Sequence, residues 1–179
     1  DAESLFIANM YGSARCEIID LWEHLGESSE VASFLDDWKE MRDAVNTHGW
    51  DGEWYVRYFE ENGTAIGSKH NLEGKIFTNG QSWPVISGFA SEERAHTSLD
   101  SVHDQLNTEH GIKLSGPGFT GYDPEKGGVT TYPPGAKENG GIFLHSNPWV
   151  MIAETKLGRG DRAFQYYSQM NPASKNDSI

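Results

Sequence analysis

The segment LFIANMYGSARCEIIDLWEHLGESSEVASFLDDWKEMRDAV, residues 5–45, shows the periodicity that decides the fold class. On both sides of Gly26 its apolar residues recur mostly at three- and four-residue steps, the period of an amphipathic helix. Gly26 ends the first helix, Ser28 or Ser29 caps the second, and Gly49 ends the second. Two helices joined by so few residues predict an antiparallel helical hairpin.

Two further helical pairs follow along the chain. A short helix is expected over residues 81–90 and a longer one, capped by Ser91, up to His110; the last pair spans residues 141–157 and 161–170. An aromatic run at residues 53–59 and a short stretch at 75–77 have the composition of strands, and residues 115–135 form a long loop.

These segments predict a mainly α fold of three helical hairpins with long loops and a few short strands. Part of a toroid of helical hairpins fits this order, and an open helical bundle fits it as well. No composition shift divides the chain, so residues 1–179 are expected to form one segment.

The charge balance restricts the partners of this chain. The sequence holds 14 Lys and Arg against 27 Asp and Glu, a net charge of −13. A field of this sign repels nucleic-acid phosphates and anionic membrane surfaces. Neutral sugars are not repelled, whereas a phosphate ion requires a local pocket of hydrogen-bond donors.

Cysteine and histidine usage gives no indication of a metal or a cofactor. Cys16 is the single cysteine, which excludes an intrachain disulfide, and the histidines show no metal-ligand spacing backed by carboxylates. We therefore expect a cytoplasmic protein. The opening residues 1–4 include no Met and no signal-peptide pattern, so we expect processing, an internal fragment or incomplete numbering.

The segment YPPGAKENGGIFLHSNPW, residues 132–149, is the most distinctive in the chain. Together with LGRGDRAF at 157–164, it resembles the cellobiose and chitobiose phosphorylases of glycoside hydrolase family 94. Supporting matches occur in the expected order: HGWDGEW at 48–54, EGKIF at 73–77, QSW at 81–83, DSV at 100–102 and EHGI at 109–112. The resemblance covers nearly the whole chain.

The resemblance implies that residues 1–179 are about the second half of an (α/α)6 barrel catalytic domain. A β-sandwich domain precedes the barrel in this family, and members usually form homodimers. The general acid is an aspartate in a Trp-Asn-Asp segment that lies before the region matching Asp1. We therefore expect no catalytic residue within this chain, and no turnover by the chain alone.

The implied reaction is inverting phosphorolysis of a β-linked disaccharide, with cellobiose as the default substrate. The acid protonates the glycosidic oxygen while phosphate attacks the anomeric carbon from the opposite face. Phosphate is already anionic, so the protein has only to hold it in line with donors such as His, Arg and backbone N–H groups. Inorganic phosphate is thus a co-substrate, and no cofactor is expected.

The resemblance places His145 at the phosphate and Glu138 at the sugar beside the bond that is cleaved. The alternatives are a packed His145 that bonds to a carbonyl, and a Glu138 that interacts with a helix start. Lys137 either contacts the acceptor sugar or offsets the charge of Glu138.

Three further residues are candidate sugar ligands, each with a structural alternative. Gln81 can donate and accept hydrogen bonds at once, but it also stands at a helix start. Trp54 can stack on a sugar or pack in a strand, and Arg57 can bind substrate or be a solvated charge. The aromatic residues expected in the core are Trp22, Trp38, Trp83, Trp149 and Phe164.

Two other functions remain open from the sequence. One is the phosphorylase-like domain of a cyclic β-glucan synthase. The other is a sugar-binding or assembly module without catalysis, which the missing acid segment favours. The intact segment from Glu138 to His145 favours the enzyme, because a binding module has no use for a phosphate site.

Overall fold

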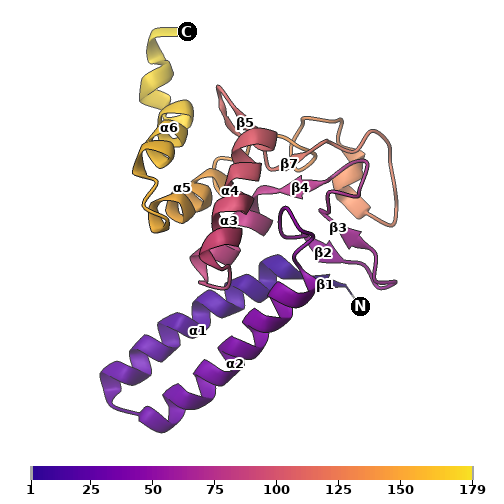
Figure 1. Ribbon diagram of the computed structural model, residues 1–179. Coiled ribbons are helices and arrows are strands. Elements are labelled where there is room, and N and C mark those ends of the chain that lie inside the picture. The colour runs from indigo at the N-terminus through magenta and orange to yellow at the C-terminus, as the bar shows by residue number, and fades with distance from the viewer. Residues whose placement is uncertain (1, 179) are drawn as a thin grey trace.

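The structure, a computed structural model, describes residues 2–178 and is mainly α (Figure 1). Its helices are α1 (Leu5–Leu25), α2 (Ser28–His48), α3 (Thr78–Ile86), α4 (Glu92–Leu106), α5 (Ser146–Lys156) and α6 (Gly160–Met170), with 3₁₀ helices η1 (Gly127–Thr131) and η2 (Pro172–Ser178). The prediction of three helical pairs is confirmed.

Short antiparallel strands connect the loops between the helical pairs. Strand β2 (Tyr58–Phe59) lies between β1 (Glu3–Ser4) and β3 (Ala65–Ile66). Strand β4 (Ile76–Phe77) pairs with β7 (Ser115–Gly116), and β5 (Asn107–Thr108) pairs with β6 (Gly111–Ile112). Each strand has two residues, so the expected run at 53–59 is a strand only at its end.

The first helix of each pair lies next to the first helix of the next pair. Contacts join α1 to α3 and α3 to α5, while α2, α4 and α6 each return along their own partner. This arrangement is the mainly α pattern expected for a segment of a helical-hairpin barrel. Figure 1 shows that the α1–α2 hairpin projects from the remaining helices.

The starts of α2 and α5 differ from the prediction. The N-cap of α2 is Glu27, without a side-chain bond, so neither predicted serine caps it. Ser91 does cap α4, because its hydroxyl accepts from the Arg94 N–H at 3.3 Å. Helix α5 begins at Ser146, later than expected, because the Gly141 carbonyl accepts from the Leu114 N–H at 2.8 Å and holds that stretch in a loop.

Two hydrophobic clusters form the core. The larger cluster joins α3, α4, α5 and α6 around Leu99, Val102 and Val150, which are fully buried. A smaller cluster at the base of the α1–α2 hairpin packs Leu5 and Val45 against the residues after α2. Phe164 is 69% exposed, so its predicted core position is wrong: α6 buries the neighbouring stripe of Ala163 and Tyr166 instead.

Candidate functional site

A buried asparagine holds the loop that precedes α5. The Asn139 side chain donates to the carbonyl oxygens of Phe119 and Tyr132 at 2.8 and 2.7 Å, and it accepts from the Phe119 N–H at 2.6 Å. A Cβ atom at Gly141 would lie 2.5 Å from the Lys137 carbonyl oxygen, so the tight return of the loop requires glycine there. The backbone of this loop is therefore well anchored.

Lys137 and Glu138 project from this anchored loop into solvent, and both are exposed. The Lys137 ammonium lies 4.7 Å from the centre of the Tyr132 ring, a cation–π contact, and makes no ion pair with Glu138. Helix α5 begins only at Ser146, so Glu138 is not a helix-start residue. The two structural alternatives from the sequence were a helix-start role for Glu138 and an offset of its charge by Lys137. Neither matches this geometry.

His145 occupies the N-cap position of α5 and is exposed. Its ring lies between the rings of Phe143 and Trp149, with centroid distances of 5.3 Å to each. Within residues 2–178, no hydrogen bond involves either ring nitrogen. The imidazole is thus oriented by two aromatic contacts while its polar atoms are available to a ligand.

Asn147, a residue that sequence reasoning missed, sets the start of α5. It is fully buried; its oxygen accepts from the Ile112 N–H at 2.8 Å, and its nitrogen donates to the carbonyls of Ile112 and Phe143 at 3.1 and 2.8 Å. Asn139 was missed in the same way. The available signal was an amide beside a glycine or proline within the distinctive segment, where side-chain bonds to turning backbone are common.

An aromatic cluster joins α1, α3 and α5. Phe6, Trp83 and Trp149 each lie 5.5–5.6 Å from the other two, centroid to centroid. His145 contacts this cluster through Trp149, and the Arg57 guanidinium lies 4.9 Å from the Phe6 ring. The structure therefore brings two of the predicted site residues, far apart in sequence, to one cluster.

Arg57 is half-buried beside the cluster rather than a solvated surface charge. Its guanidinium donates to the Ser4 hydroxyl at 3.3 Å, and no carboxylate in the described part of the chain pairs with it. Burial lowers the pKa of Arg57, against an opposing effect of Tyr58. An arginine nonetheless stays charged at neutral pH, so its positive charge lies next to the aromatic cluster with no counter-ion among residues 2–178.

Gln81 lies apart from these residues. Its side chain is fully buried; it accepts from the Tyr55 N–H at 2.9 Å and donates to the carbonyls of Tyr55 and Phe77 at 2.8 and 3.2 Å. The amide oxygen and the amide nitrogen of Gln81 therefore both bond to backbone groups. The geometry corrects the expected sugar contact in favour of the structural alternative.

Trp54 is also part of the core rather than of the exposed site. Its side chain is 6% exposed and packs in the larger hydrophobic cluster. The indole N–H is shared between the carbonyls of Gly67 and Lys75, at 3.0 and 2.9 Å. This position corrects the expected sugar contact and matches the packing alternative.

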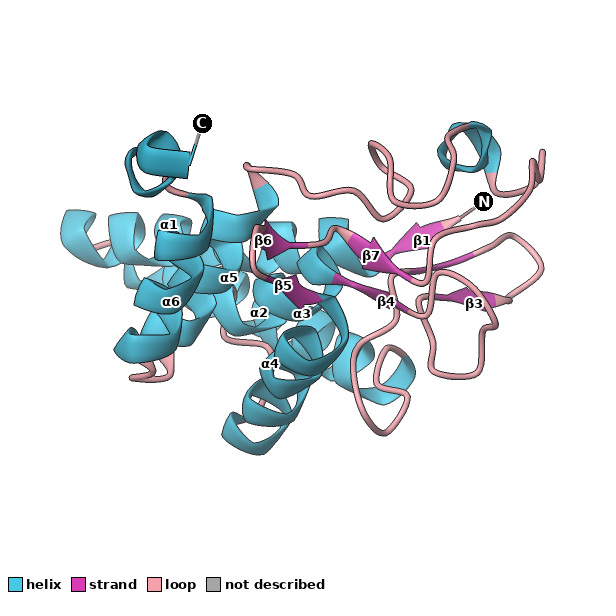
Figure 2. Ribbon diagram, turned by 90° about the horizontal axis from the view of Figure 1, so that it is seen from above, coloured by secondary structure: helices cyan, strands magenta, loops and turns pink. Residues whose placement is uncertain are grey.

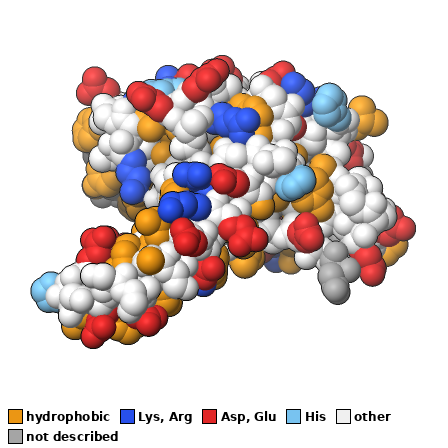
Figure 3. Space-filling view, turned by 60° about the horizontal axis from the view of Figure 1, so that its bottom comes forward, with side chains coloured by type: hydrophobic (Ala, Val, Ile, Leu, Met, Phe, Trp, Pro, Cys, Tyr) orange, Lys and Arg blue, Asp and Glu red, His pale blue; other side chains and the backbone are white. Residues whose placement is uncertain are grey.

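Residues 2–178 contain no group of three or more His, Cys, Asp or Glu side chains that could hold a metal ion. Within the same residues, no helix is both long and apolar enough to cross a membrane. Figure 3 shows acidic side chains scattered over one face and the projecting hairpin, as the net charge of −13 implies.

Comparison with known proteins identifies the family. The description "Glycosyl hydrolase 94 superfamily, catalytic domain" matches residues 1–179. The chain belongs to this family. The resemblance found in the sequence is thereby confirmed, and the three helical hairpins are a piece of a glycosyl hydrolase 94 catalytic domain.

Three relatives illustrate the range of this family. The chain is 40% identical to an N,N'-diacetylchitobiose phosphorylase of Vibrio proteolyticus over 99% of its length, which is 22% of that protein. It is 33% identical to a cellobionic acid phosphorylase of Neurospora crassa over 86% of its length, 20% of that protein. It is 32% identical to the cyclic beta-(1,2)-glucan synthase NdvB of Rhizobium meliloti over 75% of its length, 5% of that protein.

Proposed function

We propose that the protein containing this chain is an inverting phosphorylase that cleaves a β-linked disaccharide with inorganic phosphate. The observation that supports this most directly is the exposed His145, whose ring is oriented by two aromatic residues and has no hydrogen-bond partner among the described residues. Both ring nitrogens are open to solvent, so a ligand can bind them without breaking a hydrogen bond within the described residues.

The proposed mechanism assigns phosphate to the side of the site at the start of α5. The His145 ring donates a hydrogen bond to a phosphate oxygen, and the positive end of the helix dipole favours the same anion. Arg57 adds a positive charge at the far end of the aromatic cluster. His145 and the start of α5 hold phosphate where its oxygen can attack the anomeric carbon, and the Arg57 charge adds a longer-range attraction for the anion.

The sugar is assigned to the anchored loop. The Glu138 carboxylate accepts hydrogen bonds from sugar hydroxyls and stabilises the positive charge that develops at the anomeric carbon. Lys137, beside Tyr132, contacts the acceptor sugar. As the bond from phosphate to carbon forms, the glycosidic bond breaks and the leaving oxygen takes a proton from a general acid outside these 179 residues.

The substrate that we place first is N,N'-diacetylchitobiose rather than cellobiose. Two phosphorylases of that disaccharide, from Vibrio proteolyticus and Vibrio furnissii, are 40% and 35% identical over 99% of the chain. The default of cellobiose rests on the family resemblance alone. A cytoplasmic homodimer that contains a complete barrel and a β-sandwich domain is part of the same proposal.

The decisive experiment uses the full-length protein with N,N'-diacetylchitobiose, cellobiose and cellobionic acid, each with and without phosphate. Phosphate-dependent release of a sugar 1-phosphate is expected, and the α anomer is expected because attack inverts the β linkage. Release of free sugars without phosphate would contradict the proposal. Failure with every disaccharide would favour a non-catalytic sugar-binding module.

A second candidate function follows from the similarity to the cyclic glucan synthase. The chain matches 136 residues of that protein at 32% identity, so a phosphorylase-like domain of a larger synthase is a specific alternative. Incubation of the full-length protein with linear β-glucans separates the two. Change in glucan chain length without net release of sugar 1-phosphate supports the synthase.

A further inference from the structure

A cavity of about 370 Å³ lies between the β4–β7 ribbon and the back of the loop that carries Lys137 and Glu138. Figure 2 shows β4 and β7 side by side beneath the long loops. The polar lining of the cavity comes from Lys75, Gln105, Lys113 and Ser115, with the backbone of Gly118 and Gly140. None of the aromatic cluster residues lines it, so it is separate from the site around His145.

The backbone holds both lysines in place on the cavity wall. The Lys75 N–H donates to the Gly116 carbonyl at 2.9 Å, which continues the β4–β7 ladder. The Lys113 N–H donates to the Leu106 carbonyl at 3.0 Å, at the end of α4. Two different backbone anchors therefore bring two lysine residues to one cavity.

The charge of the cavity is opposite to that of the chain. Lys39, Lys69 and Lys126 each pair with a carboxylate. Lys75 and Lys113 form no such pair with any of residues 2–178, and no acidic residue lines the cavity. In a chain of net charge −13, two unpaired cations at one cavity are a local exception that favours an anion.

A buried hydroxyl belongs to one of the residues that line the cavity. Ser115 is only 1% exposed, and its Oγ has no hydrogen-bond partner within the described residues. Buried hydroxyls are usually paired, because leaving one unpaired is unfavourable. The Oγ atom itself is closed off from the cavity, so an oxyanion would accept from the lysine and Gln105 N–H groups and would reach this O–H only after the side chain turns.

We propose that this cavity binds a phosphate group, as inorganic phosphate or as a phosphate monoester, at a site distinct from His145. The Lys75 and Lys113 side chains and the Gln105 amide offer several N–H groups, which match the several acceptor oxygens of phosphate. The volume lies at the lower end of about 300–1,000 Å³ that is usual for small-ligand sites. The phosphate site itself does not depend on the proposed reaction, whereas its effect on disaccharide binding rests on the proposed function of the loop.

The cavity lies against the loop that carries Lys137 and Glu138, so a bound anion can affect that loop. Gly135 and Gly140 line it, and they stand on either side of Lys137 and Glu138 in the sequence. An anion that contacts both this wall and the β4–β7 wall restrains the loop. We expect disaccharide binding to strengthen when the cavity is occupied.

The test is calorimetric titration of the full-length protein with inorganic phosphate in a buffer free of phosphate and sulfate. The variant K75Q/K113Q is compared with K39Q/K156Q, which makes the same change in charge at lysines that do not line the cavity. We expect K75Q/K113Q to weaken one phosphate site by at least about tenfold and the control to bind as the wild type does. His145→Ala should leave this site intact.

Equal phosphate binding by K75Q/K113Q and its control would overturn the proposal, as would the absence of any site that survives His145→Ala. If circular dichroism shows that the double variant is unfolded, the single variants Lys113→Gln, at an exposed position, and Lys75→Gln carry the same test. Glucose 1-phosphate is titrated in parallel. Tighter binding of the monoester identifies a sugar phosphate as the ligand, and tighter or equal binding of inorganic phosphate identifies the free ion.

Discussion

His145 and Glu138 are exposed side chains on backbone that buried amides hold in place. Exposed side chains contribute little to folding, and substitutions at such positions usually change stability by about 0.5 kcal/mol or less. A large functional effect at either residue therefore reports a contact with substrate rather than a loss of structure. This separation makes both residues suitable for direct tests.

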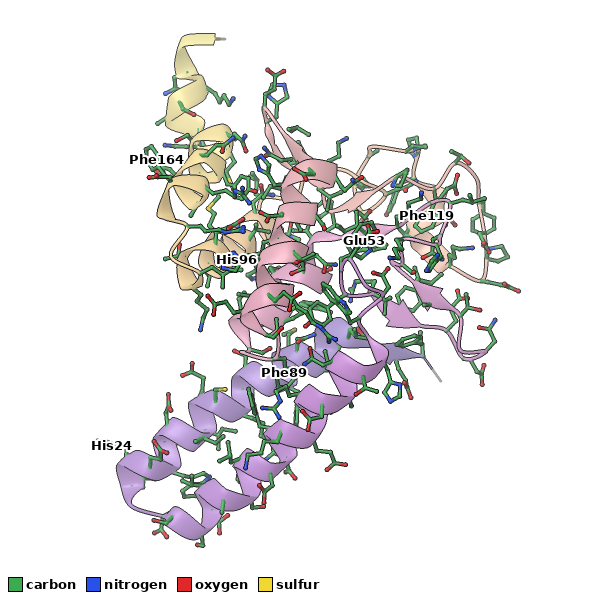
Figure 4. The ribbon with its side chains drawn as sticks, in the orientation of Figure 1. His24, Glu53, Phe89, His96, Phe119 and Phe164 are labelled. Atoms are coloured by element: carbon green, nitrogen blue, oxygen red, sulfur yellow. The ribbon has the colours of Figure 1, made fainter. Side chains whose placement is uncertain are left out.

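For His145→Ala in the full-length protein, we expect kcat/KM for phosphate to fall about 10- to 100-fold, because a charge-assisted hydrogen bond is lost. The affinity for the disaccharide should change little. Steady-state kinetics with each substrate varied in turn measures both. His24→Ala is the matched control, since that side chain lies at the far end of the hairpin (Figure 4). Unchanged phosphate kinetics would remove His145 from the site.

For Glu138→Gln, we expect turnover to fall about tenfold or more with the melting temperature unchanged, because the carboxylate interacts most strongly with the transition state. Glu125→Gln, an exposed carboxylate in the preceding loop, is the control and should keep full activity. Kinetics and thermal denaturation are measured on the same preparations. Unfolding of the Glu138 variant would indicate a structural carboxylate instead.

At the scale of elements, single buried amides connect segments that are distant in sequence. Asn147 ties the start of α5 to Ile112 in β6, and Asn139 ties the substrate loop to Phe119. Both amides bond to an N–H and to a C=O of the residue they hold. Each amide makes the pair of hydrogen bonds that a neighbouring strand would make. The positions of His145 and Glu138 depend on these bonds.

For Asn147→Ala, we expect the free energy of unfolding to fall by about 2–4 kcal/mol, because both polar groups of the buried Ile112 backbone lose their partner. KM for phosphate should rise as well, since His145 loses its support. Chemical denaturation measures the first effect and kinetics the second. Asn171→Ala, which removes only exposed bonds, one to the Tyr167 hydroxyl and one from the Ala173 N–H, should cost less, about 1 kcal/mol.

A charged network joins α4, α5 and α6. The fully buried Glu154 lies 3.4 Å from Arg159 and 3.7 Å from Arg162, and Asp100 binds both arginines. Burial raises the pKa of Glu154, against the lowering effect of the two arginines. The folded protein therefore holds this proton to higher pH than the unfolded chain does.

This shift predicts how Glu154→Gln changes the pH dependence of stability. Between the ordinary glutamate pKa of 4.5 and the raised folded value, the folded state binds more protons, so the stability of the wild type falls as pH rises. The glutamine variant lacks this titration. We expect its free energy of unfolding to increase relative to the wild type from pH 4 upward through this window, as measured by urea denaturation at a series of pH values. A pH-independent difference would contradict the shift.

At the scale of the whole molecule, stability is unevenly distributed. The only buried residue among the 21 of α2 is Val45, and those of α1 lie in its N-terminal half. Toward the tip of the hairpin, Leu21 and Leu25 are 53% and 57% exposed. In contrast, α4 packs five buried residues between the other helices. The projecting hairpin in Figure 1 thus has few contacts to resist local opening.

Hydrogen exchange of the 179-residue chain should reflect this difference. We expect amides in residues 13–39 to exchange faster than those in residues 95–106, because local opening of the hairpin exposes little additional apolar surface. Mass spectrometry after short labelling times measures both segments in one experiment. Equal protection would show that the hairpin unfolds only together with the core.

The sequence by itself determined the mainly α class, the bounds of α1, the Ser91 cap and the family, because these depend on periodicity and on contiguous residues. Only the tertiary structure decided which face of α6 is buried, that Gln81 and Trp54 bond to backbone, and that Arg57 and His145 share one aromatic cluster. Periodicity shows that a helix has an apolar face but not which element covers it. Burial and hydrogen bonding between residues tens of positions apart arise only when the hairpins pack.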